Sequence, residues 1–205
     1  MLKENKKFFR YFFLITLFLI FSCAKDFSTE KVQINLPKDI AKISGKYLIF
    51  IPEKELKLEK KFSSDDCESW SVKLNLNAIY KDSLIRLIYK MFENPRITST
   101  QYSSKEIEKE NFIAQIKILH DRSISTFKTE NNMGIFNINL SSNILIDGKK
   151  KYETNVYSNS SWQKNVYVSC NLNKGAHKAA KSGIERLMNQ IHSSVYESVF
   201  KYNRN

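Results

Sequence analysis

The chain has 205 residues, 42% of them hydrophobic, and its 33 Lys and Arg against 21 Asp and Glu give a net charge of +12. This length and apolar content suit one domain with a buried core, and 14 Phe with 10 Tyr are too many for an extended disordered chain. A total of five glycines excludes a collagen or a glycine-rich repeat.

The first 22 residues have the organisation of a secretion signal. Residues 1–10 carry four bases and one acid, and residues 11–21 are apolar apart from Thr16. A helix that spans a bilayer needs about 20 apolar residues, so this run is too short to be one. A basic segment followed by a short apolar segment is typical of a signal peptide, and residues 1–22 are therefore predicted to be removed.

The apolar run ends in Ile20-Phe21-Ser22-Cys23, which resembles the lipobox of bacterial lipoproteins. In that family an aliphatic residue stands three positions before the cysteine and a small residue directly before it, whereas Phe21 departs from the usual small residue between them. The resemblance implies that the leader is cut before Cys23 and that the Cys23 thiol carries two fatty-acid chains such as palmitate. Because Ala24 rather than Asp follows, it also implies an outer-membrane anchor with the body facing the periplasm.

Two other interpretations of the leader stay open. Ser22-Cys23-Ala24 also fits a cleavage site of small residues, and a cut after Ala24 would remove the cysteine and release a soluble protein. Alternatively, the run is a buried N-terminal helix of a cytosolic protein, although it lacks any polar face. On the lipoprotein interpretation, residues 23–31 form a polar tether and residues 32–205 form a single domain.

The body stays basic without the leader, because removing the four bases and one acid of residues 1–22 leaves a net charge of +9. The bases are mainly Lys in short groups, such as those within 54–61 and 149–151, which is typical of a solvated surface. This charge predicts a weak attraction to anionic lipid or glycan. Nucleic acid is not expected as a partner, because the chain has no Arg cluster within a known nucleic-acid-binding motif.

Cys67 and Cys170 remain once Cys23 is assigned to lipid. In a chain exported to an oxidising compartment, two remaining cysteines are expected to pair. A bridge between them would close a loop of about 100 residues and stabilise the fold by several kcal/mol in the chain-entropy model. The alternative is that both are separate buried thiols.

The sequence of the N-terminal half predicts strands that are separated by a charged, solvent-facing segment. Residues 32–36 alternate between apolar and polar and predict a strand. Residues 46–51 are a continuous apolar run, the pattern of a strand that is covered on both sides or central in a sheet. Residues 53–68 are charged and irregular and predict a solvent-facing excursion, and the alternation in residues 70–76 predicts a short strand.

Residues 77–92 predict the first helix, because their apolar side chains fall on one face at helical spacing. Asn75 or Asn77 is expected to cap its start, and Asn94-Pro95 is expected to end it. Residues 96–110 are polar and predict a loop with a helical turn.

The C-terminal half predicts a meander followed by a long helix. Residues 112–119 and 136–146 alternate as strands, and Asp147-Gly148 suits a type I′ turn into a strand at 152–156. Residues 175–201 carry one long apolar stripe and predict the last helix. The fold class is therefore α+β, with a single antiparallel sheet of about four strands and two amphipathic helices packed on one face.

In element order and size this arrangement is similar to small periplasmic lipoproteins such as the lipopolysaccharide-assembly lipoprotein. The resemblance implies that the basic surface contacts acidic lipopolysaccharide and that a sheet edge accepts a strand from an envelope protein partner. It rests on architecture and leader, and fold alone does not assign function.

The sequence contains no reaction signature: the nucleophile-elbow, phosphate-loop, dinucleotide and zinc-protease spacings are all missing. His120 and Asp121 are a candidate base and orienter, but neighbours on a strand point to opposite faces.

The sequence also offers no metal site. The cluster of Asp65, Asp66 and Glu68 lacks the spacing of a calcium loop. His177 and His192 lie about four turns apart in the last helix and cannot share one ion. We therefore expect no catalytic residue, no cofactor and no metal.

These observations predict a non-enzymatic envelope lipoprotein that acts as a scaffold or assembly component of an outer-membrane complex. The alternative is a periplasmic module that binds a lipid, glycan or solute in a cavity between the helices and the sheet. An enzyme is the third possibility, and no nucleophile, base or metal set supports it.

Overall fold

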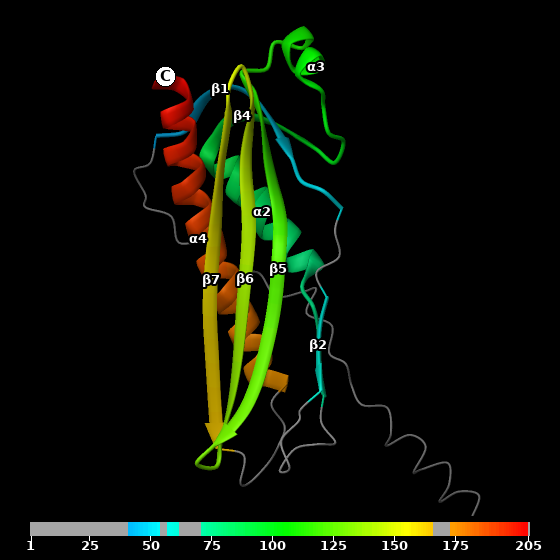
Figure 1. Ribbon diagram of the computed structural model, residues 1–205, viewed down its shortest axis with the longest axis vertical. Helices are drawn as coiled ribbons and strands as arrows, with labels where there is room; N and C mark the ends of the chain where they lie inside the picture. Colours follow the sequence, from blue (N-terminus) through cyan, green and yellow to red (C-terminus); the bar gives the residue numbers. More distant parts are fainter. Residues whose placement is uncertain (1–40, 54–56, 62–70, 166–172, 205) are drawn as a thin grey trace, which may run out of the picture.

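A computed structural model of the chain describes residues 41–53, 57–61, 71–165 and 173–204. Several sequence predictions lie outside these residues: the leader, Cys23 and its tether, the strand at 32–36, the acidic cluster, and the pairing of Cys67 with Cys170. The described residues form the folded body of the protein, which is shown with its long axis vertical in Figure 1.

The described part of the chain forms the following helices and strands. In chain order they are β1 (Ile43–Phe50), β2 (Lys57–Lys61), β3 (Ser71–Asn75), α2 (Asn77–Met91), β4 (Phe92–Thr98), α3 (Ser104–Lys109), β5 (Ala114–Glu130), β6 (Met133–Gly148), β7 (Lys151–Asn165) and α4 (Asn173–Arg204).

The main sheet has five strands in the order β4-β1-β5-β6-β7. Strand β1 runs parallel to both β4 and β5, whereas β5, β6 and β7 are joined as an antiparallel meander. The prediction of one antiparallel sheet of about four strands was therefore wrong, although the α+β class is confirmed. The physical reason is connectivity: α2 carries the chain from the β1 side of the sheet back into β4, and such a crossover produces parallel pairing.

Helix α2 begins and ends close to where its apolar spacing predicted. The Asn75 side chain accepts a hydrogen bond of 3.2 Å from the backbone N–H of Asn77, so Asn75 satisfies an amide at the helix start. The helix ends at Met91, and the chain enters β4 directly instead of a loop. Pro95 lies within β4 and pairs with Tyr47; a proline is tolerated here because β4 is an edge strand.

The loop expected at 96–110 is thus partly strand, but its helical turn is confirmed as α3. Ser103 and Glu106 form a reciprocal capping box at the start of α3. The excursion expected at 53–68 also contains a strand, β2, which pairs with β3 in a separate two-stranded sheet. The strand expected at 70–76 is confirmed as β3, but its partner is β2 and not the main sheet.

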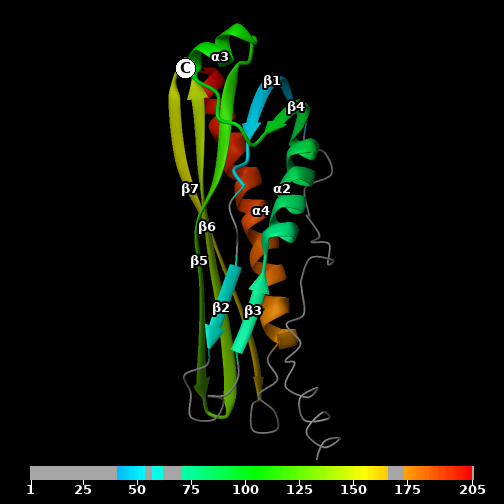
Figure 2. The same cartoon turned by 90° about the vertical axis from the view of Figure 1, so that its right-hand side faces the viewer.

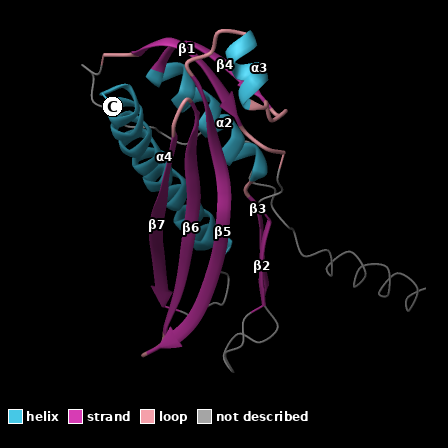
Figure 3. Ribbon diagram, turned by 45° about the horizontal axis from the view of Figure 1, so that its top comes forward, coloured by secondary structure: helices cyan, strands magenta, loops and turns pink. Residues whose placement is uncertain are grey.

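Strand β1 is covered on both faces, as its continuous apolar run predicted. Tyr47 and Ile49 are fully buried in the main core, which includes the helices. Leu48 points the other way and packs in a second cluster with Ile107 of α3 and Phe112. Figure 3 shows that α3, β1 and β4 gather at one end of the molecule, away from the far ends of β5, β6 and β7.

Helices α2 and α4 cover the same face of the sheet (Figure 2), as predicted. The apolar stripe of α4 is buried along its whole length, and each member has 3% or less of its surface exposed. Its members are Ala176, Ala180, Ile184, Leu187, Met188, Ile191, Val195 and Val199. Burying such side chains contributes roughly 1.5–3 kcal/mol for each of the larger ones, so this interface stabilises the fold strongly.

Two hairpins join the long strands. The β5–β6 hairpin turns at Asn131 and Asn132, whose φ angles of 51° and 60° make a type I′ turn between the paired Glu130 and Met133. The β6–β7 hairpin lies where the sequence predicted it, but Asp147 pairs with Lys151 and the tip comprises residues 148–150. The expected type I′ turn on Asp147-Gly148 was therefore wrong, since neither residue has a positive φ.

Gly148 instead allows Tyr202 and Ala114 to pack closely against the backbone at this position. A Cβ there would overlap the Tyr202 hydroxyl and lie 3.2 Å from the Ala114 Cβ. That hydroxyl also accepts a hydrogen bond of 3.0 Å from the Lys149 backbone N–H. The C-terminal end of α4 thus holds the hairpin tip in place.

Candidate binding surface on the outer face of the sheet

The face of β5, β6 and β7 that points away from α2 and α4 is called the outer face here. Its side chains alternate with the buried ones along each strand. On β6 the alternation is plain: Leu140 and Ser142 are buried towards the helices, whereas Asn139 and Asn143 lie on the outer face and are more exposed. Figure 2 shows the two helices on one side of these strands and the outer face on the other.

A β-bulge interrupts β5 in the middle of this face. His120 pairs with Ser142 and Arg122 pairs with Ser141, so Asp121 is an extra residue without a partner position on β6. The bulge reverses the alternation: the even-numbered Ile116 and Ile118 face the core before it, and the odd-numbered Phe127 does so after it. Bulges of this kind often redirect side chains beside functional sites.

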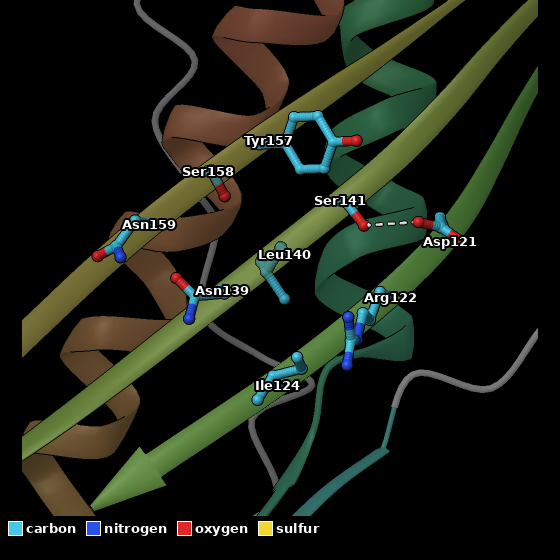
Figure 4. A pocket seen from close by; sticks show the side chains of 9 residues that line it. All are labelled: Asp121, Arg122, Ile124, Asn139, Leu140, Ser141, Tyr157, Ser158 and Asn159. Atoms are coloured by element: carbon cyan, nitrogen blue, oxygen red, sulfur yellow. Dashed lines mark hydrogen bonds between the residues drawn. The ribbon is translucent and has the colours of Figure 1, made fainter.

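A hollow of about 480 Å³ opens beside the bulge (Figure 4). Nine residues from three adjacent strands line it: Asp121, Arg122, Ile124, Asn139, Leu140, Ser141, Tyr157, Ser158 and Asn159. The backbone pairing sets their relative positions, because Ser141 lies opposite Tyr157 and Asn139 lies opposite Asn159. The hollow is therefore built on paired strands and not on a loop.

Asp121 is held in place by its neighbour on β6. The Ser141 hydroxyl donates a hydrogen bond of 3.0 Å to an Asp121 carboxylate oxygen. Ser141 itself is 5% exposed, so this contact lies at the floor of the hollow. One carboxylate oxygen is thereby oriented while the other keeps its capacity to accept hydrogen bonds.

Several other polar side chains around the hollow form no hydrogen bond or ion pair with the described residues. No hydrogen bond or ion pair joins the side chains of Arg122, Asn139 or Asn159 to another described residue, and the same holds for the Tyr157 hydroxyl. Tyr157 has 67% of its surface exposed, which is unusual for so large an apolar ring. The hollow thus presents an open aromatic face next to unused donors and acceptors.

His120 and Asp121 point to opposite faces, as the strand geometry predicted. The His120 ring lies on the helix side, with Nε2 2.7 Å from the Ser123 Oγ and its centroid 5.6 Å from that of Tyr80. The Tyr80 hydroxyl in turn lies 3.1 Å from the Ser142 Oγ, and burial raises the Tyr80 pKa to about 12. These groups tie α2 to the sheet, and Asp121 does not meet them.

The other two histidines lie on α4 at separate places. His192 is 8% exposed, its ring centroid is 5.7 Å from that of Tyr196, and burial lowers its pKa. His177 is nearer the start of the helix and half-buried. Within the described residues, no group of three or more His, Cys, Asp or Glu side chains is arranged to hold a metal ion.

The sequence did not single out Arg122, Asn139 or Tyr157 as site residues. One signal was available: Tyr157 stands in the middle of β7 among Thr, Asn and Ser residues, whereas the other two rings of the strand, Tyr152 and Trp162, lie nearer its ends. The bulge could not be found in the same way, because a single extra residue in a polar stretch changes no recognisable motif. None of the helices in the described part of the chain has the length and apolar character needed to cross a bilayer.

No protein-family model matches this chain, and no curated protein matches it. Among solved structures, it is similar to a minor lipoprotein from Acinetobacter baumannii, with 10% identity, a TM-score of 0.42, and coverage of 75% of this chain and 91% of that one. It is also similar to a Xanthomonas campestris protein of the DUF330 family, with 10% identity, a TM-score of 0.49, and coverage of 85% and 97%. A hypothetical protein from Chlamydia trachomatis matches at 14% identity and a TM-score of 0.42, with coverage of 78% and 98%. With TM-scores below 0.5, none of these matches assigns a function to this chain.

Proposed function

We propose that this protein is a non-enzymatic bacterial lipoprotein, anchored in the outer membrane through acylated Cys23 and facing the periplasm, where it acts as a scaffold or assembly component of an envelope complex. The leader carries the anchoring part of the proposal, because its basic start, short apolar run and Ile20-Phe21-Ser22-Cys23 end stand at compatible spacing. Two acyl chains hold a protein at a bilayer far more firmly than one.

The scaffold part rests on one observation, the long edge strand β7. It is the last strand in the sheet order and spans 15 residues from Lys151 to Asn165. An edge strand presents backbone N–H and C=O groups that a strand from another protein can pair with. Arg186 of α4 donates a hydrogen bond of 2.8 Å to the Asn159 backbone carbonyl of β7, whereas Asn155, four residues earlier in the strand, is exposed.

Two features make a scaffold a better account than the alternatives. The candidate pair His120 and Asp121 is split between the two faces of the sheet, which removes the one acid–base pair that the sequence suggested for an enzyme. The space between helices and sheet is filled by large buried side chains such as Leu84, Leu87 and Ile88, all with 0% exposure. A ligand cavity at that place is therefore disfavoured, and the hollow described above lies on the other face.

The anchoring is tested by labelling intact bacteria with alkyne-tagged palmitate and fractionating the cells. We expect the wild-type protein to carry label and to sediment with the outer membrane. A Cys23→Ser variant should carry no label, whereas Cys67→Ser, which also removes one cysteine, should still carry label even though it is expected to be less stable. A wild-type protein without label in the soluble periplasmic fraction would instead show cleavage after Ala24 and overturn the anchor.

A further inference from the structure

We propose that the hollow on the outer face is a carbohydrate-binding site that takes uncharged pyranose units of a glycan. This inference does not depend on the scaffold role of β7 or on the lipid anchor. It rests on the combination of an open aromatic ring, a set of unused hydrogen-bonding groups and a rigid floor, all within one hollow of about 480 Å³ (Figure 4).

The aromatic ring is that of Tyr157. A pyranose has one face of C–H groups, and such a face is covered best by a flat ring that carries a polar group at its tip. Tyr157 is 67% exposed and projects from β7 at the border of the hollow. A large ring left this open does not contribute to the core of the protein.

The polar groups suit sugar hydroxyls, which both donate and accept hydrogen bonds. Arg122 supplies N–H donors, and Asn139 and Asn159 each supply a carbonyl acceptor and an amide donor. The Asp121 carboxylate adds acceptors and is oriented by Ser141 at 3.0 Å. A mixed set of donors and acceptors of this kind favours a hydroxyl-rich ligand over an apolar one.

The charges of the hollow favour an uncharged ligand. Asp121 and Arg122 are adjacent and of opposite sign, and no other ionisable acid or base lines the hollow. A site for phosphate or for a carboxylate would be weakened by the Asp121 charge, because like charges repel at short range. Neutral hydroxyl groups meet no such penalty.

The hollow is also preorganised. Its side chains come from three hydrogen-bonded strands, and the cross-strand pairs Ser141 with Tyr157 and Asn139 with Asn159 fix their spacing. The volume lies within the range of roughly 300–1,000 Å³ that small-molecule sites occupy. Because the paired backbone is already ordered, binding costs only the freedom of the side chains that contact the ligand.

The test uses the full-length protein in detergent micelles and isothermal titration calorimetry with three soluble probes, the tetrasaccharides of N-acetylglucosamine, glucose and mannose. We expect at least one probe to bind. Tyr157→Ala should weaken that binding by roughly tenfold or more, because the stacking ring is lost. The matched control Tyr89→Ala removes another exposed tyrosine, 55% exposed on α2, and should leave binding unchanged.

A second arm identifies the source of the sugar. Phosphatidylcholine vesicles with and without a digalactosyl lipid are offered to the same proteins in a flotation assay. Binding of soluble tetrasaccharides supports a polysaccharide ligand, and binding only to the sugar-bearing vesicles supports a glycolipid headgroup. Absence of binding in both arms, or equal binding by wild type and Tyr157→Ala, would overturn the proposal. Thermal unfolding of Tyr157→Ala checks that the variant is folded.

Discussion

The hydroxyl groups of Tyr80 on α2 and Ser142 on β6 lie 3.1 Å apart inside the molecule. Tyr80 is 6% exposed and Ser142 is fully buried, so the contact joins helix to sheet within the core. Its burial raises the pKa of Tyr80 to about 12, from an ordinary value of 10.0. The phenol therefore keeps its proton in the folded state at pH values where the unfolded chain releases it.

This shift predicts a loss of stability at alkaline pH. The folded pKa is raised above the unfolded one, so the stabilisation is fully present below pH 10.0 and is lost as the pH rises towards about 12. Tyr80 should account for a loss of about 1 kcal/mol by pH 11 and about 2 kcal/mol by pH 12. Urea unfolding at pH 8, 10 and 11 should show a steeper decline for wild type than for Tyr80→Phe. Parallel declines would contradict this account.

Two glycines of α4 predict opposite responses to alanine. A Cβ on Gly175 would overlap the ring of Trp162, whereas a Cβ on Gly183 would lie 3.5 Å from Leu140 Cδ1, an ordinary contact. Gly175→Ala should therefore lower the free energy of unfolding by about 1–3 kcal/mol through overpacking. Gly183→Ala should raise it by roughly 0.5–1 kcal/mol, because alanine is the better helix former. Denaturant unfolding measures both, and a destabilised Gly183→Ala would show that the α4–β6 contact is tighter than described.

The bulge predicts an unusual tolerance to deletion. Removing Asp121 leaves every core residue of β5 on its own face, because the extra residue is what reverses the alternation. Removing Thr126 instead turns the buried Phe127 towards the outer face. We expect the Asp121 deletion to cost about 1 kcal/mol, mainly from the lost Ser141 contact, and the Thr126 deletion to cost about 3 kcal/mol or more. Equal losses in thermal unfolding would refute the assignment of Asp121 as the bulged residue.

The pairing of Cys67 with Cys170 remains a prediction from the sequence alone. Intact-mass measurement of the mature protein after alkylation should find no modified thiol without a reductant and two after reduction. Removal of a native bridge typically costs 2–5 kcal/mol in small secreted domains, so Cys67→Ser should lower the stability of the protein. Two alkylated thiols without reduction would eliminate the bridge.

The helices and the buried strand could be predicted because each has a strong periodic signal. The stripe of α4 and the face of α2 follow the helical period, and β1 is apolar on both faces because helices cover one side and Phe112 with Ile107 covers the other. These patterns lie within single segments, so they can be recognised without knowing which segments pack together.

The sheet topology could not be predicted in the same way. Whether β1 pairs in parallel depends on how α2 connects it to β4, and the sequence of a single strand does not reveal that connection. Strand β4 was missed because its sequence is polar and contains Pro95, which an edge strand tolerates. The turn at Asn131-Asn132 carried a usable signal, since asparagine accepts positive φ values, whereas Asp147-Gly148 suggested a turn type that the structure does not adopt, because neither residue has a positive φ.

The candidate site was the least predictable part. Its residues come from three strands, and they meet only because the bulge and the pairing register place them together. Asp121 was noticed for its neighbour His120, yet its structural partner is Ser141. Local spacing identifies sites within one element, and this hollow spans three.

The central claim, that a lipid-anchored body binds an envelope partner at the β7 edge, is tested most directly by site-specific photocrosslinking in living bacteria. A benzoylphenylalanine residue would replace exposed Asn155 on β7, with Tyr89 on α2 as the control position. We predict one dominant adduct with an envelope protein from position 155, absent from position 89 and lost when Cys23→Ser is added. No protein adduct from position 155, or the same adducts from both positions, would contradict the claim.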